Sequence, residues 1–443
     1  MILSGMHCTL YAMVDFNSHI LIVGAGAFGT STAYHLAQRG YKSIRVLDRY
    51  EYPSIDAAST DISKIIRFDY NEPLYARLGL ESIEAWKSEL FDGLYHVPGW
   101  VLSAMDLSVP FVKGSIEVSE QLGVSGLEIM TTDQMRQRFP QVKGKLDGWN
   151  INVWNPTAGW VASGEAVVRL VEDARAKGVE YISGRRGFAQ EVITSQSGEC
   201  TGVRTLDGTI HSADVVVLAA GAWLPSLIDM EGQLTAKGHS VAHIQLSAEE
   251  TKHYAPIPIM DNLELGYFFP PTTNGIFKMA HSKFITNHVP IGRNGSVISK
   301  PHTFVENPQD GLPKDIEATM RRNLERVFPE LANRPFSFTR LCWDADTADR
   351  HFLITPHPEH KGLFVAAGGS AHGFKFMPVL GKYIADMLEG KLDADIAESW
   401  RWRPGQDVSG KNLAHMDPEM ELCDLPGWQG RNRAQFKSRE ARL

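Results

Sequence analysis

The residues that could hold a phosphate group stand together near the N-terminus: Gly24, Gly26, Ala27, Phe28 and Gly29. The three glycines follow an apolar run at residues 19–23 and open a helical pattern at residues 31–39. In a dinucleotide fold the first glycine permits a tight turn, the second lets backbone amides approach a pyrophosphate, and the third lets the helix pack closely on the strand. The pattern therefore predicts dinucleotide binding.

The next expected strand, residues 43–47, ends in an acidic residue. Asp48 stands nineteen positions beyond the last glycine of the turn, where a carboxylate accepts ribose hydroxyls and disfavours a 2′-phosphate. NAD and FAD remain open on this ground alone. A later apolar strand breaks into a small-residue turn that is typical of flavoproteins and favours FAD, with Ala220, Gly221 and Trp223 as expected cofactor contacts.

The remaining patterns alternate between helix and strand and predict an α/β protein. Helical spacing of apolar residues recurs over residues 74–90, 164–177 and 315–328. Continuous apolar runs at 214–221 and 362–369 are typical of buried strands in a nucleotide-binding sheet. Between them, β-rich runs within 242–269 are separated by proline and polar turns, which indicates an antiparallel sheet.

We therefore expect a discontinuous Rossmann-like FAD-binding domain with an inserted α+β substrate domain built on an antiparallel sheet. The FAD-binding domain is expected to comprise residues 19–82, 157–238 and 338–405. The substrate domain is expected to comprise residues 83–156 and 239–337, with an N-terminal extension at 1–18 and a C-terminal tail at 406–443.

Composition narrows the classes of partner. The 443 residues have a formal net charge of −8 without a basic or acidic block, which argues against nucleic acid and membrane surfaces and favours a small molecule. Four scattered cysteines predict neither a disulfide framework nor a metal site. No window reaches the roughly 18 apolar residues of a membrane span, so we expect a soluble protein, and no pattern demands a partner chain, so we expect a monomer.

The last three residues, Ala441-Arg442-Leu443, match the small-basic-leucine pattern of a C-terminal peroxisomal address. This ending favours an intracellular, peroxisomal location, with the cytoplasm as the alternative. A chance ending is the other interpretation of so short a motif.

Four motifs, in this order, resemble those of the monomeric sarcosine oxidase family of flavin-dependent amine oxidases. They are the glycine turn, then Leu218–Trp223, Arg340–Thr347 and Gly368–Lys375. The likeness is greatest to the fungal branch, which holds fructosyl amino acid oxidases (amadoriases), saccharopine oxidases and pipecolate oxidases, and it spans residues 19–405. The resemblance implies oxidation of a secondary amine α to a carboxylate, with oxygen as acceptor, to give an imine and hydrogen peroxide.

The resemblance also implies roles for particular residues. Cys342 would form a thioether to the flavin 8α-methyl group, and Lys278 would lie near flavin N5, where a buried cation stabilises superoxide. Arg67 and Lys375 would hold the substrate carboxylate, the first as a planar fork and the second as a point charge. His372 would contact the flavin or be a satisfied core histidine. The remaining expected cofactor contacts are Arg49, Ser63, Lys64, Gly373 and Phe374.

One departure from the family pattern concerns the substrate. Fructosyl amino acid oxidases carry an acidic pair just after the lysine, whereas this chain has Met279–Lys283, with His281 inside it. The difference favours pipecolate, saccharopine, sarcosine or another N-alkyl amino acid over a fructosyl amine. A fructosyl substrate, oxidative cyclisation of an N-methylated secondary metabolite, and a flavin dehydrogenase without oxygen reactivity remain alternatives. Because the nucleotide domain is expected to be discontinuous, Cys342 and Lys278 should approach the flavin from different domains.

Overall fold

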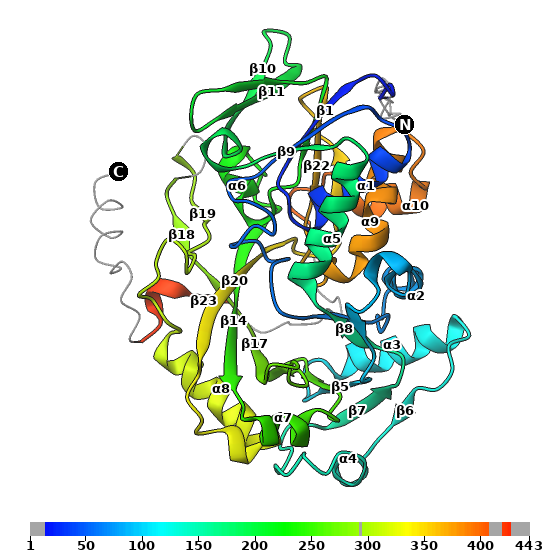
Figure 1. Ribbon diagram of the computed structural model, residues 1–443, viewed down its shortest axis with the longest axis vertical. Helices are drawn as coiled ribbons and strands as arrows, with labels where there is room; N and C mark the ends of the chain where they lie inside the picture. The colour runs from blue at the N-terminus through cyan, green and yellow to red at the C-terminus, as the bar shows by residue number, and fades with distance from the viewer. Residues whose placement is uncertain (1–13, 292–294, 407–418, 427–443) are drawn as a thin grey trace, which may run out of the picture.

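The computed structural model describes residues 14–291, 295–406 and 419–426, and two large sheets dominate it (Figure 1). The first has six strands in the order β21 (Leu353–Pro356), β22 (Leu363–Ala367), β13 (Val215–Leu218), β1 (His19–Val23), β2 (Ser43–Leu47) and β9 (Glu180–Ile182). β1 lies at its centre and pairs in parallel with β2 and β13. Parallel strands that are buried on both faces have continuous apolar sequences, and this is why these strands could be predicted from the sequence.

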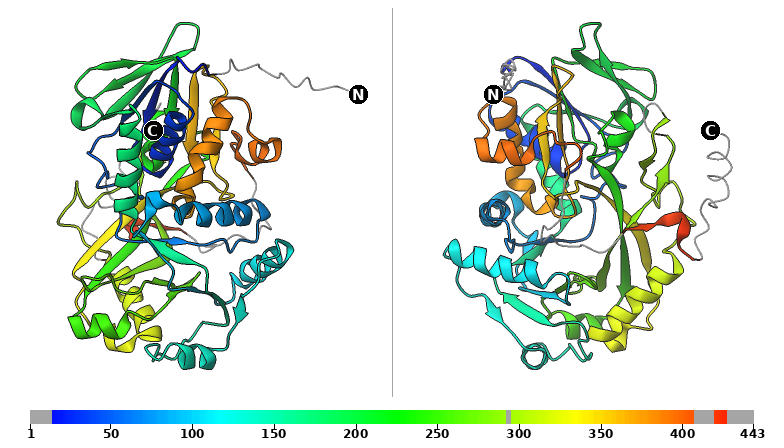
Figure 2. Two further views of the ribbon diagram at one scale, coloured as in Figure 1. Left: turned by 45° about the vertical axis from the view of Figure 1, so that its right-hand side comes forward. Right: turned by 180° about the vertical axis from the view of Figure 1, so that it is seen from behind.

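Helices cover one side of this sheet. α1 (Ala27–Gln38) packs between α9 (Met377–Leu388) and α5 (Ser163–Ala176), as Figures 1 and 2 show. α10 (Ala394–Trp400) contacts β21, and α2 (Pro73–Trp86) contacts α9. The C-terminal helix α9 thus packs against the N-terminal helix α1, so the two ends of the chain contribute to one domain. The α/β class and the discontinuous Rossmann-like domain predicted from the sequence are confirmed.

The second sheet is mostly antiparallel. Its strands follow the order β20 (Phe338–Asp346), β14 (Thr235–Gln245), β17 (Ile276–Thr286), β16 (Gly266–Phe268), β15 (Ile259–Asn262), β5 (Trp100–Ala104), β7 (Ile151–Asn155) and β6 (Glu128–Ile129), and β23 (Met420–Glu421) also pairs with β17. The helices of this half are α3 (Val109–Gln121), α4 (Thr132–Arg138), α7 (Ala248–Tyr254) and α8 (Lys314–Val327). α8 packs on β17, on the outer side of the long strands (Figure 2).

Three small sheets and one short helix complete the described fold. β3 (Lys64–Ile66), β8 (Gly159–Val161) and β4 (Tyr95–His96) form one sheet, and β18 (His288–Val289) pairs with β19 (Ile298–Ser299). The third sheet is β10 (Ala189–Thr194), β11 (Cys200–Thr205) and β12 (Ile210–Ser212), and the short helix is α6 (Leu224–Leu227). β3 contacts the 3-10 turn Gly373–Phe376, so the loop after the nucleotide sheet meets a strand from the start of the chain.

The position of β20 differs from the prediction. Residues 338–346 were expected in the FAD-binding domain, but β20 pairs with β14 in the second sheet. In the register of this sheet, Cys342 lies opposite His239 and Lys278 lies opposite His243, so both residues stand on neighbours of β14. The expectation that Cys342 and Lys278 come from different domains is therefore wrong. We propose the other predicted domain boundaries unchanged, except for the two that cut an element: the boundary at 82/83 falls inside α2, and the boundary at 238/239 falls inside β14, which begins at Thr235.

The alternation of residues along β20 explains this difference. Arg340, Cys342 and Asp344 share one face of the strand, and Leu341 and Trp343 share the other. Polar and apolar residues that alternate are typical of an antiparallel sheet with two unlike faces, not of a parallel strand buried on both faces.

Replacing Gly29 with alanine tests whether α1 can pack against the glycine turn only when residue 29 has no side chain. The added methyl group would overlap the Gly24 carbonyl oxygen, and overpacking of this kind costs about 1–3 kcal/mol. We expect a lower urea midpoint of unfolding and a lower flavin content in the purified protein. Gly164→Ala is the matched control, because a methyl group there in α5 meets nothing closer than 3.4 Å. Equal midpoints for the two variants would contradict the close packing.

Candidate active site

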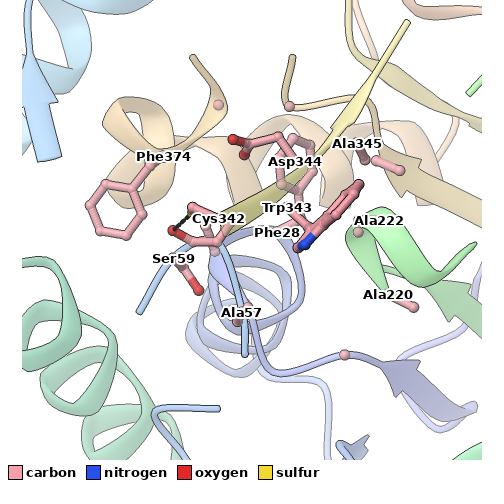
Figure 3. Close-up of a pocket in the computed structure, with 18 of the residues that line it drawn as sticks. Phe28, Ala57, Ser59, Ala220, Ala222, Cys342, Trp343, Asp344, Ala345 and Phe374 are labelled. Atoms are coloured by element: carbon pink, nitrogen blue, oxygen red, sulfur yellow. Dashed lines mark hydrogen bonds between the residues drawn. The ribbon is translucent and has the colours of Figure 1, made fainter. Parts of the chain in front are cut away.

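A cavity of about 410 Å³ lies where the two sheets meet. It is lined by the glycine turn, by β20, and by the segment after β22, and Figure 3 shows Cys342, Trp343, Asp344 and Ala345 along its strand wall, with Phe374 from another element nearby. The predicted residues that line it are Gly24, Gly26, Ala27, Phe28, Asp48, Arg49, Ser63, Lys64, Arg67, Ala220, Gly221, Trp223, Cys342, His372, Gly373, Phe374 and Lys375. Gly29 and Lys278 do not line it; they support residues that do.

The nucleotide end of the cavity is shaped for an anion. Gly24 has a φ of 110°, and a side chain there would overlap the Ala219 carbonyl. Gly26 is the N-cap of α1, and no side chain caps the first turn of the helix, so its backbone amides remain available. Amides at a helix N-terminus together with the helix dipole bind phosphate groups.

Asp48 and Arg49 close this end of the cavity. The Asp48 carboxylate accepts hydrogen bonds from the Ala25 amide at 2.8 Å and from the Ser54 hydroxyl at 2.8 Å, so the protein itself orients the group expected at the ribose. The Arg49 guanidinium lies 4.3 Å from the centre of the Trp223 ring. Trp223 is thereby held at the cavity wall, where the sequence had placed a cofactor contact.

Two hydroxyl groups in the cavity wall show that the residues present fit a polar cofactor. Ser59 and Ser63 line the cavity, and the hydroxyl oxygens of both are buried without a hydrogen-bond partner among the described residues. Buried polar groups are normally satisfied, so these two point to a ligand that supplies the missing partners. Together with the glycine turn, they fit FAD.

Arg67 and Lys375, the residues expected to hold the substrate carboxylate, both line the cavity. Arg67 is 9% exposed and donates to the Asp69 carbonyl, and its guanidinium carbon lies 4.4 Å from the centre of the Tyr70 ring and 4.9 Å from that of Trp100. Lys375 is 5% exposed and donates to the His372 carbonyl at 2.9 Å. Burial, followed by the charge of Arg67, lowers the pKa of Lys375 well below its usual value. Two buried cations side by side favour an anion between them.

His372 is satisfied within the protein. Its Nε2 faces the Arg350 carbonyl at 2.8 Å and therefore carries the proton, which leaves Nδ1 to accept from the Tyr70 hydroxyl at 3.2 Å. Burial and the nearby Lys375 charge lower its pKa well below the usual value, so the ring is neutral. Of the two predicted alternatives, this geometry favours the satisfied histidine, although the ring also lines the cavity.

Cys342 lies on the part of the cavity wall that β20 forms. The residue is 4% exposed, and its Sγ lies 3.9 Å from Lys64 Nζ and 3.9 Å from the Ala58 carbonyl oxygen. Burial alone would lower the pKa of Lys64, but its interactions with neighbours, among them Asp61 and Asp344, raise it. The ammonium group of Lys64 thus lies against the sulfur.

Lys278 lies behind the wall. It is 1% exposed, and its Nζ donates to Asp61 Oδ2 at 2.7 Å and to the Ser63 carbonyl at 2.6 Å. The same Asp61 oxygen lies 3.3 Å from Arg340 and 3.7 Å from Lys64. Burial lowers the pKa of Lys278 to about 8, with Asp61 opposing the shift. The three cations hold the pKa of Asp61 far below its usual value despite its burial.

Three carboxylates in and behind this site were missed by sequence reasoning. Asp344 could have been found, because it stands two residues after Cys342 and so shares a strand face with it. Asp61 precedes Lys64 in a loop and carries no sequence signal of its role. Asp261 lies in the four-residue strand β15, where two apolar residues are followed by Asp261 and Asn262, and so short a stretch carries no signal of a site residue.

The fold and the cavity define a dinucleotide-dependent oxidoreductase with a second, substrate-side sheet. The family described as FAD dependent oxidoreductase (DAO) matches residues 19–387. L-saccharopine oxidase from Schizosaccharomyces pombe is 33% identical over 410 residues, which cover 88% of this chain and 94% of that protein. Monomeric sarcosine oxidase from a Bacillus species is 26% identical over 388 residues, which cover 85% of this chain and 94% of that protein.

Solved structures agree with this match. The deglycating fructosamine oxidase Amadoriase II from Aspergillus fumigatus, in complex with FSA, has a TM-score of 0.84 and 32% identity, over 94% of this chain and 98% of that one. The chain belongs to the FAD dependent oxidoreductase family, and within it to the amine oxidases related to monomeric sarcosine oxidase, as predicted. Among the described residues, no helix is long and apolar enough to cross a membrane, and no cluster of ligating side chains fits a metal ion.

Removing the Asp61 charge tests its role as counter-ion. Asp61→Asn leaves two buried cations, Lys278 and Arg340, and the half-buried Lys64 without their carboxylate, and breaking a buried pair of this kind costs about 3–5 kcal/mol. Because the pKa of Asp61 is depressed on folding, the wild-type contribution is present above pH ~4 and is lost as the pH falls below it. We therefore expect the stability difference between wild type and variant, measured by urea unfolding, to shrink in acid.

The exposed Asp147 provides a control for loss of one charge. Asp147→Asn should leave the urea midpoint within about 0.5 kcal/mol of wild type. If Asp61→Asn behaved like Asp147→Asn at neutral pH, the buried cluster would not depend on this carboxylate.

Proposed function

We propose that this enzyme oxidises a secondary amine α to a carboxylate, giving an imine and hydrogen peroxide with oxygen as the electron acceptor. The observation that carries the proposal is the pair Arg67 and Lys375: both are buried, both line the cavity, and neither forms an ion pair with a carboxylate among the described residues. An anionic group of the substrate therefore has a prepared site. The related saccharopine and sarcosine oxidases are named for secondary amino acids, which fit the same requirement.

The residues of the chain would position the substrate more than react with it. Arg67 and Lys375 bind the carboxylate, and Tyr267 and Phe269 in the cavity wall exclude water from the carbon beside it. FAD, when bound, supplies the chemistry by accepting two electrons with the hydrogen of that carbon. The imine leaves and is hydrolysed in water.

Lys278 is the residue that we propose for the reaction with oxygen. Its ammonium group is held by Asp61 and by the Ser63 carbonyl, one layer behind the cavity. A fixed positive charge stabilises negative charge that develops on oxygen when it takes up an electron. The support for this role is position and burial together, because a solvated lysine would be screened.

The substrate within this class is a second question. No carboxylate stands along β17 after Lys278, and His281 lies on the opposite strand face from Lys278 and makes its hydrogen bond with the Lys283 amide. The absence of an acidic residue on this strand supports pipecolate, saccharopine, sarcosine or another N-alkyl amino acid. A fructosyl amino acid is the second candidate, and the structural likeness to Amadoriase II favours it.

A panel of amines tests the proposal. Pipecolate, saccharopine, sarcosine and fructosyl-valine are each added to the flavin-loaded enzyme, and hydrogen peroxide is measured. We expect release with at least one N-alkyl amino acid and little or none with its carboxyl amide, because the amide removes the charge that Arg67 and Lys375 bind. Equal rates with acid and amide would contradict the proposal. Reduction of an artificial acceptor without peroxide would instead indicate a dehydrogenase.

We further propose that Cys342 attaches FAD covalently through its sulfur. Support comes from its place on the cavity wall, 3.9 Å from Lys64, in a sequence context that resembles the family. After acid denaturation, yellow colour should stay with the polypeptide, and the mass of the chain should include the flavin. Cys342→Ser should release the colour, whereas Cys200→Ser, in the first sheet's core, should retain it. Colour lost from the wild-type polypeptide would exclude the tether.

We propose a monomer that is directed to peroxisomes. The C-terminal tripeptide that supports this location, Ala441-Arg442-Leu443, lies outside the described residues, as does most of the expected N-terminal extension. A peroxide-producing enzyme fits a compartment that destroys peroxide.

A further inference from the structure

Asp261 is a buried carboxylate on the cavity wall with an oxygen that has no partner. It lies on β15, is 6% exposed, and lines the cavity with Arg67 and Lys375. Its Oδ1 is buried and makes no hydrogen bond among the described residues. A buried acceptor without a donor costs about 1–3 kcal/mol, and more when it is charged. The Trp100 indole N–H approaches this carboxylate and lowers its pKa, but neither Trp100 Nε1 nor Asp261 Oδ1 completes a hydrogen bond of normal geometry, so the carboxylate has room for a donor from a ligand.

The charged groups around Asp261 come from every neighbouring element. Arg67 follows β3, Lys375 lies in the 3-10 turn Gly373–Phe376, and Glu264 lies in the turn after β15. On the adjacent strands, Tyr267 of β16 lies opposite Asp261 in the register and Leu102 of β5 lies on its other side. Burial raises the pKa of Asp261 to about 7, and the charges of Arg67 and Lys375 oppose this shift.

A counter-ion role alone does not explain this carboxylate. Asp261 reduces the net positive charge at Arg67 and Lys375, which weakens the attraction for a substrate carboxylate. A substrate with its amine beside its carboxylate resolves the conflict, since the carboxylate contacts the cations while the ammonium group donates to Asp261. The unsatisfied Oδ1 and the pair of cations are then complementary to one zwitterion.

The chemistry of amine oxidation adds a second requirement. At neutral pH a free secondary amine is an ammonium ion, with a pKa near that of lysine, roughly 10. Its nitrogen lone pair is needed to stabilise the carbon that loses hydride, so the ammonium group must first lose a proton. A general base works best when its own pKa lies near the working pH.

We propose that Asp261 is the base that accepts the ammonium proton of the bound substrate, an inference that rests on the proposed function. In this step the N–H bond breaks, its electron pair stays on nitrogen as the lone pair, and an O–H bond forms at Oδ1. No atom is oxidised or reduced. After the product leaves, the proton passes from Asp261 to water, and the carboxylate is regenerated.

The rate of flavin reduction without oxygen, measured against pH, tests this role. In wild type the rate should rise through the pKa of Asp261, about 7. In Asp261→Asn the rise should move toward the pKa of the free amine, so that the variant is about 100-fold slower near pH 7 and recovers at high pH. Asp261→Glu should restore the wild-type profile in part. A carboxylate without the nitrogen should still bind Asp261→Asn at least as tightly, as followed by the flavin absorption spectrum.

Several outcomes would overturn the inference. An unchanged pH profile in Asp261→Asn would do so, as would an equal loss of rate at every pH, which indicates a structural role. Asp344→Asn is the comparison variant, because Asp344 is a second carboxylate on the cavity wall whose pKa burial raises, to about 6. If the pH-dependent rise moved in Asp344→Asn instead, the base would be Asp344. If no amine reduced the wild-type flavin at any pH, the proposed function itself would fail, and this inference with it.

Discussion

One buried carboxylate holds the reactive half of this molecule together. Asp61 lies in a loop before β3 and is within 4 Å of Lys64, Lys278 and Arg340. Lys278 comes from β17 and Arg340 from β20, so the ion pairs join a loop of the nucleotide-binding half to two strands of the other sheet. Without this counter-ion the buried Lys278 and Arg340 and the half-buried Lys64 would repel one another in a medium of low dielectric. The wall that carries Cys342 and Ser63 is therefore fixed by charge as well as by packing.

The two ends of the cavity in front of this wall are suited to different chemical groups. Its nucleotide end offers backbone amides, a helix N-terminus and an aspartate held by backbone and hydroxyl donors. Its other end combines the cations Arg67 and Lys375 with the carboxylate Asp261. An arrangement with both signs of charge favours a zwitterion over a simple anion or a simple amine. Both an N-alkyl amino acid and a fructosyl amino acid carry a secondary amine and a carboxylate, so the order of these two candidates rests on the missing acidic residue after Lys278 in β17.

Local patterns were sufficient to predict much of the fold. The glycine turn, the buried parallel strands and the helices α1, α5 and α8 have strong local signals, because close packing and helical periodicity act over short stretches of chain. The strand β20 was assigned to the wrong sheet, because its pairing with β14 joins segments far apart in the sequence, and no local pattern encodes such a partner. The alternation of polar and apolar residues along β20 is the local signal that agrees with the antiparallel sheet.

The site was predicted unevenly for a similar reason. Residues inside family motifs, such as Arg67, Cys342 and Lys375, were found and do line the cavity. Lys278 was predicted, but it lies behind the residues that line the cavity. A motif identifies a residue and does not say how far the residue lies from the cavity. Asp61 and Asp261 were missed, because each acquires its role only from cations that other segments bring to it. Charge complementarity of this kind is a property of the folded chain.

The most direct measurement is a crystal structure of the flavin-loaded enzyme with a carboxylate-bearing secondary amine that cannot be oxidised. The account predicts the carboxylate between Arg67 and Lys375, with the nitrogen within hydrogen-bonding distance of Asp261 Oδ1. A ligand whose carboxylate contacts neither cation, or whose nitrogen points away from Asp261 toward water, would contradict it.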